Sequence, residues 1–302
     1  MHVRLPTWIK APRRSGMHDT MHLLRKHRLS TVCEEARCPN RGECFSKPTA
    51  AFLILGPQCT RSCAFCSVDT GVPHPVDHNE PEQVAAAASE MNLGYVVITS
   101  VTRDDLPDGG AGQFAKTVSA VRAALPNARV EVLIPDFNGN TAALDIVLEA
   151  KPDVLNHNME TVSRICSQIR PKACYGRSLS LLANAKRNSP DILTKSGLML
   201  GLGETVGEVL ELLRDLQNSR CDLLTMGQYL QPTKKNLSVV EYIRPETFET
   251  LGKKALDMGF RSVASGPLVR SSMHAQEMYY DACSGKCCMM GGKVVLERKE
   301  VE

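Results

Sequence analysis

Short runs of apolar and β-branched residues recur along the chain, and segments with apolar residues at helical spacing lie between them. The runs predict buried strands at residues 51–55, 95–101, 129–134, 153–158, 198–202, 222–230 and 262–264. The intervening pattern predicts helices at residues 82–91, 113–125, 208–216 and 247–258. Strand therefore alternates with helix through most of the sequence.

This alternation is typical of βαβ units, which build a parallel sheet. About six or seven such units favour a full or partial βα-barrel over a short Rossmann sheet. We therefore predict an α/β fold, a partial (β/α)6 TIM-like barrel at residues 49–266, with an N-terminal extension at 1–48 and a C-terminal segment at 267–302. A doubly wound open sheet would give nearly the same pattern, so that alternative stays open.

Composition and charge exclude several classes of protein. The 302 residues are 43% hydrophobic and 23% charged, which excludes a disordered chain, and the net charge of +3 is far from that of a dedicated nucleic-acid binder. No apolar run approaches the roughly 18 residues of a membrane span, and the start lacks the apolar core of a signal peptide. We expect a soluble, cytoplasmic protein without a nucleic-acid or membrane partner.

The strongest chemical signal is a group of three cysteines, Cys59, Cys63 and Cys66, directly after the first predicted strand. Loops that follow barrel strands open on the face where active sites are built. Three thiolates can hold three irons of a 4Fe–4S cluster and leave the fourth iron open to another ligand. The alternatives are a zinc site, which would seek a fourth ligand, or three unrelated buried thiols.

A second group, Cys33, Cys38 and Cys44, lies upstream in a segment that contains the turn dipeptides Pro39-Asn40 and Arg41-Gly42. These spacings do not align on one helix face, so the segment is predicted to be a loop that curls around a ligand. Taken alone, this triplet could bind zinc or nothing. Beside the other triplet, it suggests two iron–sulfur centres, each with one iron that no thiolate holds.

With Arg270-Ser271-Ser272 near the C-terminus, the two triplets resemble those of the lipoyl synthases, a family of radical S-adenosylmethionine enzymes. The resemblance runs from about Pro6 to Ala275. The family usually has tyrosine after the two serines, whereas this chain has Met273, so packing there is expected to differ.

The resemblance implies two 4Fe–4S clusters and S-adenosylmethionine as cofactors. It places one cluster on Cys59, Cys63 and Cys66, where S-adenosylmethionine binds the open iron and is cleaved to a radical. It places the other cluster on Cys33, Cys38 and Cys44, with Ser272 as a fourth, oxygen ligand and Ser271 as the near alternative. That second cluster would supply two sulfur atoms to carbons six and eight of an octanoyl chain on a lysine.

The resemblance also implies partners: octanoylated lipoyl-carrier domains, an electron donor such as ferredoxin or flavodoxin, and an iron–sulfur carrier that repairs the second cluster. Further candidates for binding S-adenosylmethionine follow two predicted strands: Gly109, Gly110, Asn158, Glu160 and Arg170. Glycines allow close backbone approach, and the polar groups suit ribose hydroxyls and a carboxylate. A turn and a set of surface polar residues would look the same.

Two other functions remain open at this point. One is a different radical S-adenosylmethionine enzyme whose second cluster is not consumed, and the other is a non-enzymatic iron–sulfur or zinc protein. The remaining cysteines fall into two groups: Cys166, Cys174 and Cys221, expected to be packing residues or indifferent thiols, and Cys283, Cys287 and Cys288, which lie outside the resemblance and have no assigned role.

Overall fold

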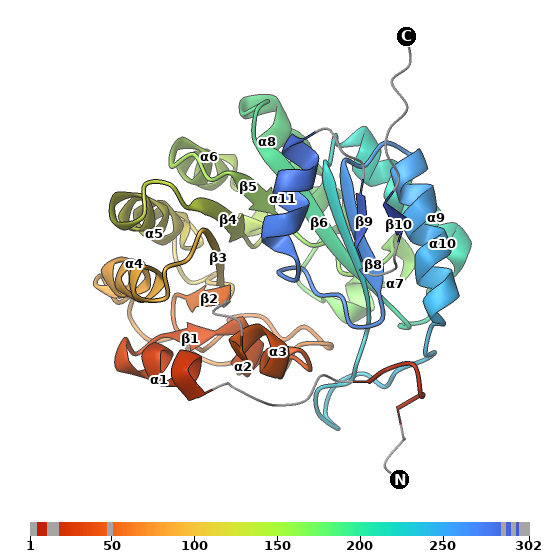
Figure 1. Ribbon diagram of the computed structural model, residues 1–302, viewed down its shortest axis with the longest axis horizontal. Coiled ribbons are helices and arrows are strands. Elements are labelled where there is room, and N and C mark those ends of the chain that lie inside the picture. The colour runs from red at the N-terminus through yellow and green to blue at the C-terminus, as the bar shows by residue number, and fades with distance from the viewer. Residues whose placement is uncertain (1–4, 11–17, 47–50, 285–287, 291–293, 296–302) are drawn as a thin grey trace.

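The structure, a computed structural model, describes residues 5–10, 18–46, 51–284, 288–290 and 294–295. A run of parallel strands forms its centre, each paired with the next along the chain (Figure 1). These strands are β2 (Ala51–Ile54), β3 (Tyr95–Ser100), β4 (Arg129–Leu133), β5 (Val154–Asn156), β6 (Leu193–Leu200), β7 (Leu223–Gln228), β8 (Ser262–Gly266) and β9 (Cys288–Met290). Short antiparallel strands, β1 (Ser30–Thr31) and β10 (Val294–Val295), stand at the two edges.

Within the described residues, the two edge strands do not pair with each other, so the curved sheet stays open. The predicted α/β fold with a partial, TIM-like barrel is therefore confirmed. The parallel run is longer than six strands, because it continues through β8 to β9. Strand β6 also begins earlier than the predicted residue 198, because its first half contains polar residues that are nonetheless buried.

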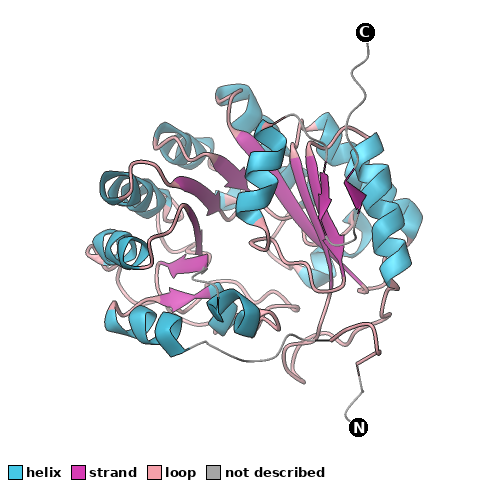
Figure 2. Cartoon of the chain, in the orientation of Figure 1, coloured by secondary structure: helices cyan, strands magenta, loops and turns pink. Residues whose placement is uncertain are grey.

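Helices cover the convex side of the sheet, and Figure 2 shows them as an outer layer around the strands. They are α4 (Glu80–Glu90), α5 (Ala111–Ala124), α6 (Thr141–Glu149), α7 (Ser163–Ile169), α8 (Tyr175–Asn188), α9 (Val206–Asn218) and α10 (Pro245–Asp257), with the 3-10 turn η1 (Phe137–Gly139). Three further helices, α1 (His18–Lys26), α2 (Val32–Glu35) and α3 (Arg41–Ser46), lie beside β1 and β2 (Figure 1). The hydrophobicity pattern does not predict α1–α3, α6–α8 or the last helix, α11 (Ala275–Cys283).

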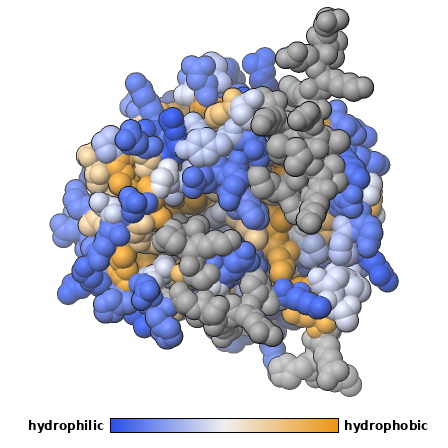
Figure 3. Space-filling model, viewed as in Figure 1, coloured by the Kyte–Doolittle hydropathy of each residue, from blue (hydrophilic) through white to orange (hydrophobic). Residues whose placement is uncertain are grey.

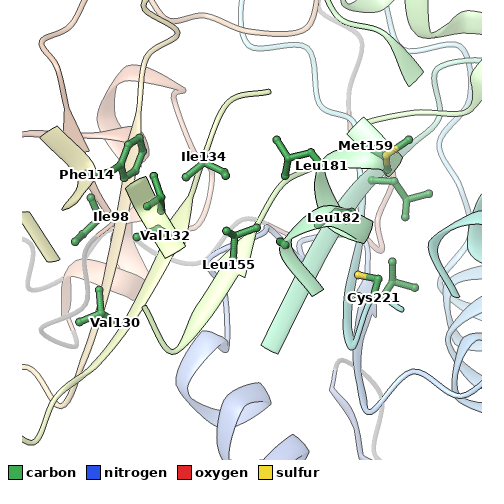
Figure 4. Close-up of a cluster of buried hydrophobic side chains, with 14 of the residues drawn as sticks. Ile98, Phe114, Val130, Val132, Ile134, Leu155, Met159, Leu181, Leu182 and Cys221 are labelled. Carbon is green, nitrogen blue, oxygen red and sulfur yellow. The ribbon is translucent and has the colours of Figure 1, made fainter. Parts of the chain in front are cut away.

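The main hydrophobic core fills the space between the strands and this outer layer. Figure 4 shows Ile98, Val132 and Leu155 from the strands near Phe114 and Leu182 from the helices, and all are fully buried. Figure 3 shows a mostly hydrophilic rim around the visible face, with hydrophobic residues toward the middle and left. No helix in the described ranges is long and apolar enough to cross a membrane.

Helix α11 (Ala275–Cys283) lies on the concave side of the sheet (Figure 1). Its Met278 and Ala282 belong to one apolar cluster with Leu193 and Leu223, the first residues of β6 and β7. The helix therefore closes the amino end of the barrel interior with apolar side chains.

A buried polar network forms the next layer of the interior. The Lys195 ammonium lies 3.0 Å and 3.2 Å from the two carboxylate oxygens of Glu131, and neither side chain is exposed to solvent. The Tyr95 hydroxyl and the Asn156 amide donate to the same carboxylate at 2.8 Å and 3.1 Å. Because β3, β4, β5 and β6 each contribute one member, this network fixes their register inside the barrel.

We predict that Lys195→Met lowers the free energy of unfolding by about 3–5 kcal/mol, because it leaves the Glu131 carboxylate charged and unpaired in the interior. Urea denaturation of the metal-free chain measures this. Lys253→Met is the matched control, because Lys253 pairs with Glu249 on an exposed helix surface, where such a pair contributes at most about 0.5 kcal/mol. Equal effects of the two substitutions would contradict the role assigned to the network.

Candidate functional site

The three cysteines after β2 lie in a loop that we call the barrel cysteine loop (residues 59–66). Main-chain contacts tie it to the loop after β3: the Thr60 amide donates to the Thr102 carbonyl at 3.0 Å, and the Thr102 amide donates to the Cys59 sulfur at 3.4 Å. A side chain from the loop after β7 holds its other end, because Asn236 Nδ2 donates to the Cys66 carbonyl at 2.7 Å. The loop is therefore fixed at the carboxyl edge of the sheet.

A buried arginine inside this loop makes the strongest of its contacts. The Arg61 guanidinium binds Asp104 through two bonds of 2.8 Å and Asp136 at 2.7 Å, and it is only 5% exposed. Arg177 reaches the other oxygen of Asp136 at 3.1 Å. Burial tends to raise the pKa values of Asp104 and Asp136, but the hydrogen bonds from Arg61 outweigh it and lower both, so both carboxylates are charged.

Sequence reasoning missed this arginine cluster, although Arg61 stands between two of the cysteines. Its partners lie in the loops after β3 and β4, and residue type alone does not show which carboxylates face it. The sequence feature that could have indicated this cluster is a single arginine inside a loop predicted to hold metal ligands.

The sulfurs of the barrel cysteine loop are partly buried and free of disulfides. Burial raises the pKa of Cys63 to about 11 and that of Cys66 to about 12, and the neighbouring thiols of the loop add to both shifts. Thiols in such surroundings stay protonated until a metal displaces the proton. Cysteine thiolates are the usual ligands of iron–sulfur clusters, so these three residues fit such a cluster.

The upstream cysteines lie in residues 33–44, which we call the N-terminal cysteine loop. The prediction of a continuous loop is wrong here, because Cys33 lies on helix α2 and Cys44 on helix α3, and only Cys38 lies in the turn between the two short helices. Burial raises the pKa of Cys33 to about 12, and the thiols of Cys38 and Cys44 add to the shift. The Cys38 amide donates to the Cys33 carbonyl at 3.1 Å, which brings these two residues together. The Asn40 carbonyl accepts the amides of Glu43 and Cys44 at 3.0 Å, which begins the helix that carries Cys44. Within the described residues, no three His, Cys, Asp or Glu side chains converge on the position of a single metal ion.

The two cysteine loops touch each other. The Ser67 hydroxyl, one residue after the barrel cysteine loop, donates to the carbonyl of Glu35 in the N-terminal cysteine loop at 2.8 Å. The structure therefore brings both triplets to the same edge of the molecule, as their proposed cooperation requires.

The two candidate serines form the corner of a β-turn, the serine turn (residues 270–273), which the Met273 amide closes by donating to the Arg270 carbonyl at 2.9 Å. Ser271 Oγ donates to Asn158 Oδ1 at 2.9 Å, inside the barrel. No hydrogen bond of the Ser272 side chain is among the contacts described. Burial lowers the pKa of Arg270 and the nearby Cys38 opposes that shift, so the turn also adjoins the N-terminal cysteine loop.

The polar candidates after β5 are also brought together. Asn158 Nδ2 donates to the Glu160 carboxylate at 3.1 Å, and Arg170 donates to the Asn158 carbonyl at 3.0 Å. Burial raises the pKa of Glu160, which Arg170 partly offsets, and both residues act electrostatically on the Cys63 thiol. Asn158, Glu160 and Arg170 therefore lie between the barrel cysteine loop and the serine turn.

A glycine beneath these residues lets them approach the sheet. A Cβ atom on Gly197 would lie 2.7 Å from Ser271 Oγ, 2.7 Å from Thr225 Oγ1 and 2.8 Å from Asn158 Oδ1. Because Gly197 has no side chain, these three oxygens can all lie close to the same position of β6, at the carboxyl end of the interior.

Gly109 and Gly110 begin helix α5 with positive φ angles of 60° and 93°. A Cβ atom on Gly109 would lie 2.9 Å from the Phe137 ring, and one on Gly110 would overlap Leu55. Packing thus accounts for both glycines.

The remaining cysteines divide as follows. Cys166 and Cys221 are buried, whereas Cys174 and Cys283 are exposed. Cys287 and the side chain of Cys288 lie outside the described residues.

The sequence model of the Radical SAM superfamily matches residues 53–216. A lipoyl synthase of Caldanaerobacter subterraneus subsp. tengcongensis is 54% identical over 276 residues, covering 91% of this chain and 97% of that protein. A lipoyl synthase of Alkaliphilus metalliredigens is 53% identical over 276 residues, covering 91% of this chain and 95% of that protein.

Among solved structures, methylornithine synthase superposes with a TM-score of 0.54 at 13% identity, covering 92% of this chain and 82% of that chain. The hydrogenase maturase HydG superposes with a TM-score of 0.55 at 12% identity, covering 91% and 68%. At these identities the likeness shows a shared fold alone.

Both lipoyl synthases are more than 50% identical to this chain over about nine tenths of its length, which establishes the family. The superfamily match covers more than half of the chain and includes the barrel cysteine loop. Membership of this superfamily implies a 4Fe–4S cluster and S-adenosylmethionine. The chain belongs to the lipoyl synthase family, within the Radical SAM superfamily, and is a radical SAM enzyme.

Proposed function

We propose that this enzyme inserts two sulfur atoms at carbons six and eight of an octanoyl chain carried on a lysine of a lipoyl-carrier domain. The observation that carries this proposal is the contact between two three-cysteine loops at one edge of the barrel, through Ser67 and Glu35. Two inorganic centres held on those loops would face a common space, into which an acyl chain can reach. The lipoyl synthase relatives support the same reaction.

Cys59, Cys63 and Cys66 hold the cluster of the radical SAM superfamily in this proposal. When bound, that cluster and S-adenosylmethionine supply the radical chemistry that an unactivated C–H bond requires and that no side chain provides. Asn158 and Glu160 bind ribose hydroxyls and Arg170 meets a carboxylate in this proposal, because Glu160 and Arg170 act electrostatically on the Cys63 thiol and Asn158 is hydrogen-bonded to both. In this proposal, the loop that ends at Gly109 and Gly110 contributes backbone groups to the binding site for S-adenosylmethionine.

Cys33, Cys38 and Cys44 hold the second 4Fe–4S cluster, which is the sulfur substrate of the reaction. Ser272 supplies its fourth, oxygen ligand, because Ser271 is already engaged by Asn158. Oxygen is a harder ligand than thiolate and is displaced more easily from iron, which suits a cluster that gives up its sulfide.

The role of the buried arginine in the barrel cysteine loop is to position that loop. Arg61 holds the loop to the loops after β3 and β4, so the three sulfurs keep their places while ligands enter and leave. At the amino end, the apolar helix α11 and the buried Lys195–Glu131 pair fill the interior below the site.

In this proposal, different segments of the chain serve the two clusters. Residues 1–48 and 267–302 provide the ligands of the sulfur-donating cluster, and residues 49–266 provide the radical chemistry. The partners in this proposal are the octanoylated carrier domain, a ferredoxin or flavodoxin as electron donor, and an iron–sulfur carrier that rebuilds the consumed cluster.

The reaction itself is the first test. With both clusters reconstituted without oxygen, we predict that an octanoylated carrier peptide, S-adenosylmethionine and a reductant yield a product with two added sulfur atoms, measured by mass spectrometry. Deoxyadenosine accumulation with no sulfur gained by the peptide would contradict the sulfur-inserting function while leaving the superfamily intact.

The two triplets are expected to have separate roles. Cys38→Ala should abolish sulfur insertion but leave reductive cleavage of S-adenosylmethionine, because the barrel cysteine loop is unchanged. Cys63→Ala should abolish both. Deoxyadenosine and product are quantified by liquid chromatography, and equal loss of both by either substitution would argue against divided roles.

The two serines are expected to differ as well. Ser272→Ala should remove one iron ligand and abolish sulfur insertion, whereas Ser271→Ala should slow it by about tenfold, because it removes only the hydrogen bond to Asn158. Single-turnover product formation measures both effects. The reverse ranking would transfer the ligand role to Ser271.

A further inference from the structure

Asn40 joins the two ends of the chain at the proposed sulfur-donor site. Its side-chain amide donates to the Leu268 carbonyl at 2.6 Å and to the Met273 sulfur at 3.3 Å, across 228 and 233 residues of sequence. Leu268 and Met273 flank the serine turn, one before it and the other at its last position. One side chain therefore forms hydrogen bonds at both ends of the serine turn.

The orientation of the Asn40 amide is fixed by its surroundings. The Leu268 carbonyl can only accept, so the nitrogen must face it. Asn40 is 1% exposed, and its side-chain oxygen is buried and has no hydrogen-bond partner among the residues that the structure describes. Burying an amide oxygen without a hydrogen-bond partner costs free energy. The two contacts that the amide nitrogen donates are therefore the structural role of Asn40.

The backbone of Asn40 belongs to the opposite half of the same site. Its carbonyl accepts the amide of Cys44 at 3.0 Å and thereby begins α3. The residue thus connects a proposed sulfur ligand through its main chain with the proposed oxygen ligand through its side chain.

We propose that Asn40 is a positioning residue that presents Ser272 to the sulfur-donating cluster by holding the serine turn against the N-terminal cysteine loop. Ser271, anchored to Asn158, holds the turn from the barrel side, and Asn40 holds it from the cysteine side. This inference rests on the proposed function and adds a residue that touches neither iron nor substrate. Met273 takes part through its sulfur, which accepts from the same amide.

The test uses the full chain with Cys59→Ala, Cys63→Ala and Cys66→Ala, which keeps only the N-terminal triplet. After reconstitution with 57Fe, this parent should hold about four irons per chain, with a Mössbauer component for the oxygen-ligated site. Adding Asn40→Asp keeps the side-chain shape but replaces the donor with oxygen. We expect about three irons per chain and the EPR signal of a three-iron cluster, because the serine no longer reaches the fourth iron.

A matched control comes from the other cysteine loop. Asn236 donates in the same way to the Cys66 carbonyl, so Asn236→Asp imposes a similar change where the parent has no cluster. That control should keep about four irons. Combining Asn40→Asp with Ser272→Ala should cause no further loss of iron beyond Ser272→Ala alone, because both changes act on one ligand.

Hydrogen exchange of the metal-free chain gives a readout that does not depend on iron. Asn40→Asp and Asn40→Ala should each speed amide exchange in the serine turn by about tenfold relative to the parent, with the exchange of β6 unchanged. Asn40→Ala removes the donor without adding charge and serves if the aspartate variant does not fold.

Four irons with an unchanged Mössbauer spectrum in both Asn40 variants would overturn the inference, whether or not the serine turn exchanges faster. A parent without a cluster would instead overturn the proposed function, and the inference with it. Equal iron loss in the Asn236→Asp control would show a general weakening of the fold and would also overturn the inference.

Discussion

All strands from β2 to β8 run in one direction, and this constraint places every loop that follows them at a single edge of the sheet. Cysteines near residue 60, polar groups near residue 158 and serines near residue 271 meet there although most of the chain separates them. The opposite edge of the interior is closed by the apolar face of α11. The site depends on this asymmetry, because only one end of the barrel is left open to ligands.

Three side chains, of which Arg61 and Asn40 are buried and Asn236 is partly buried, hold the ligand loops at that edge through charge or through main-chain carbonyls. Arg61 binds two carboxylates, and the amides of Asn236 and Asn40 bind carbonyls of other loops. Each contact is at least partly shielded from solvent, where a donor without its acceptor is costly, so each favours one loop position. The loops can then keep their sulfur atoms in place before iron arrives.

The sequence was sufficient to predict the alternation of strands and helices and to identify both cysteine triplets, because spacing and hydrophobic period are local properties. It did not reveal the start of β6, since Thr194, Lys195 and Ser196 are polar yet buried. It did not show which serine turns toward Asn158, because that depends on the backbone of the serine turn. Contacts such as Asn40 with Leu268 join residues 228 positions apart and leave no local pattern.

The central claim is that the two cysteine triplets serve one cavity, and a crystal structure grown without oxygen, with S-adenosylmethionine and an octanoyl-lysine peptide bound, tests it most directly. The account predicts one cluster on each cysteine loop, with the alkyl chain lying between them and a Ser272 oxygen on iron. An acyl chain that reaches only one cluster, with the other on a separate face of the molecule, would contradict it.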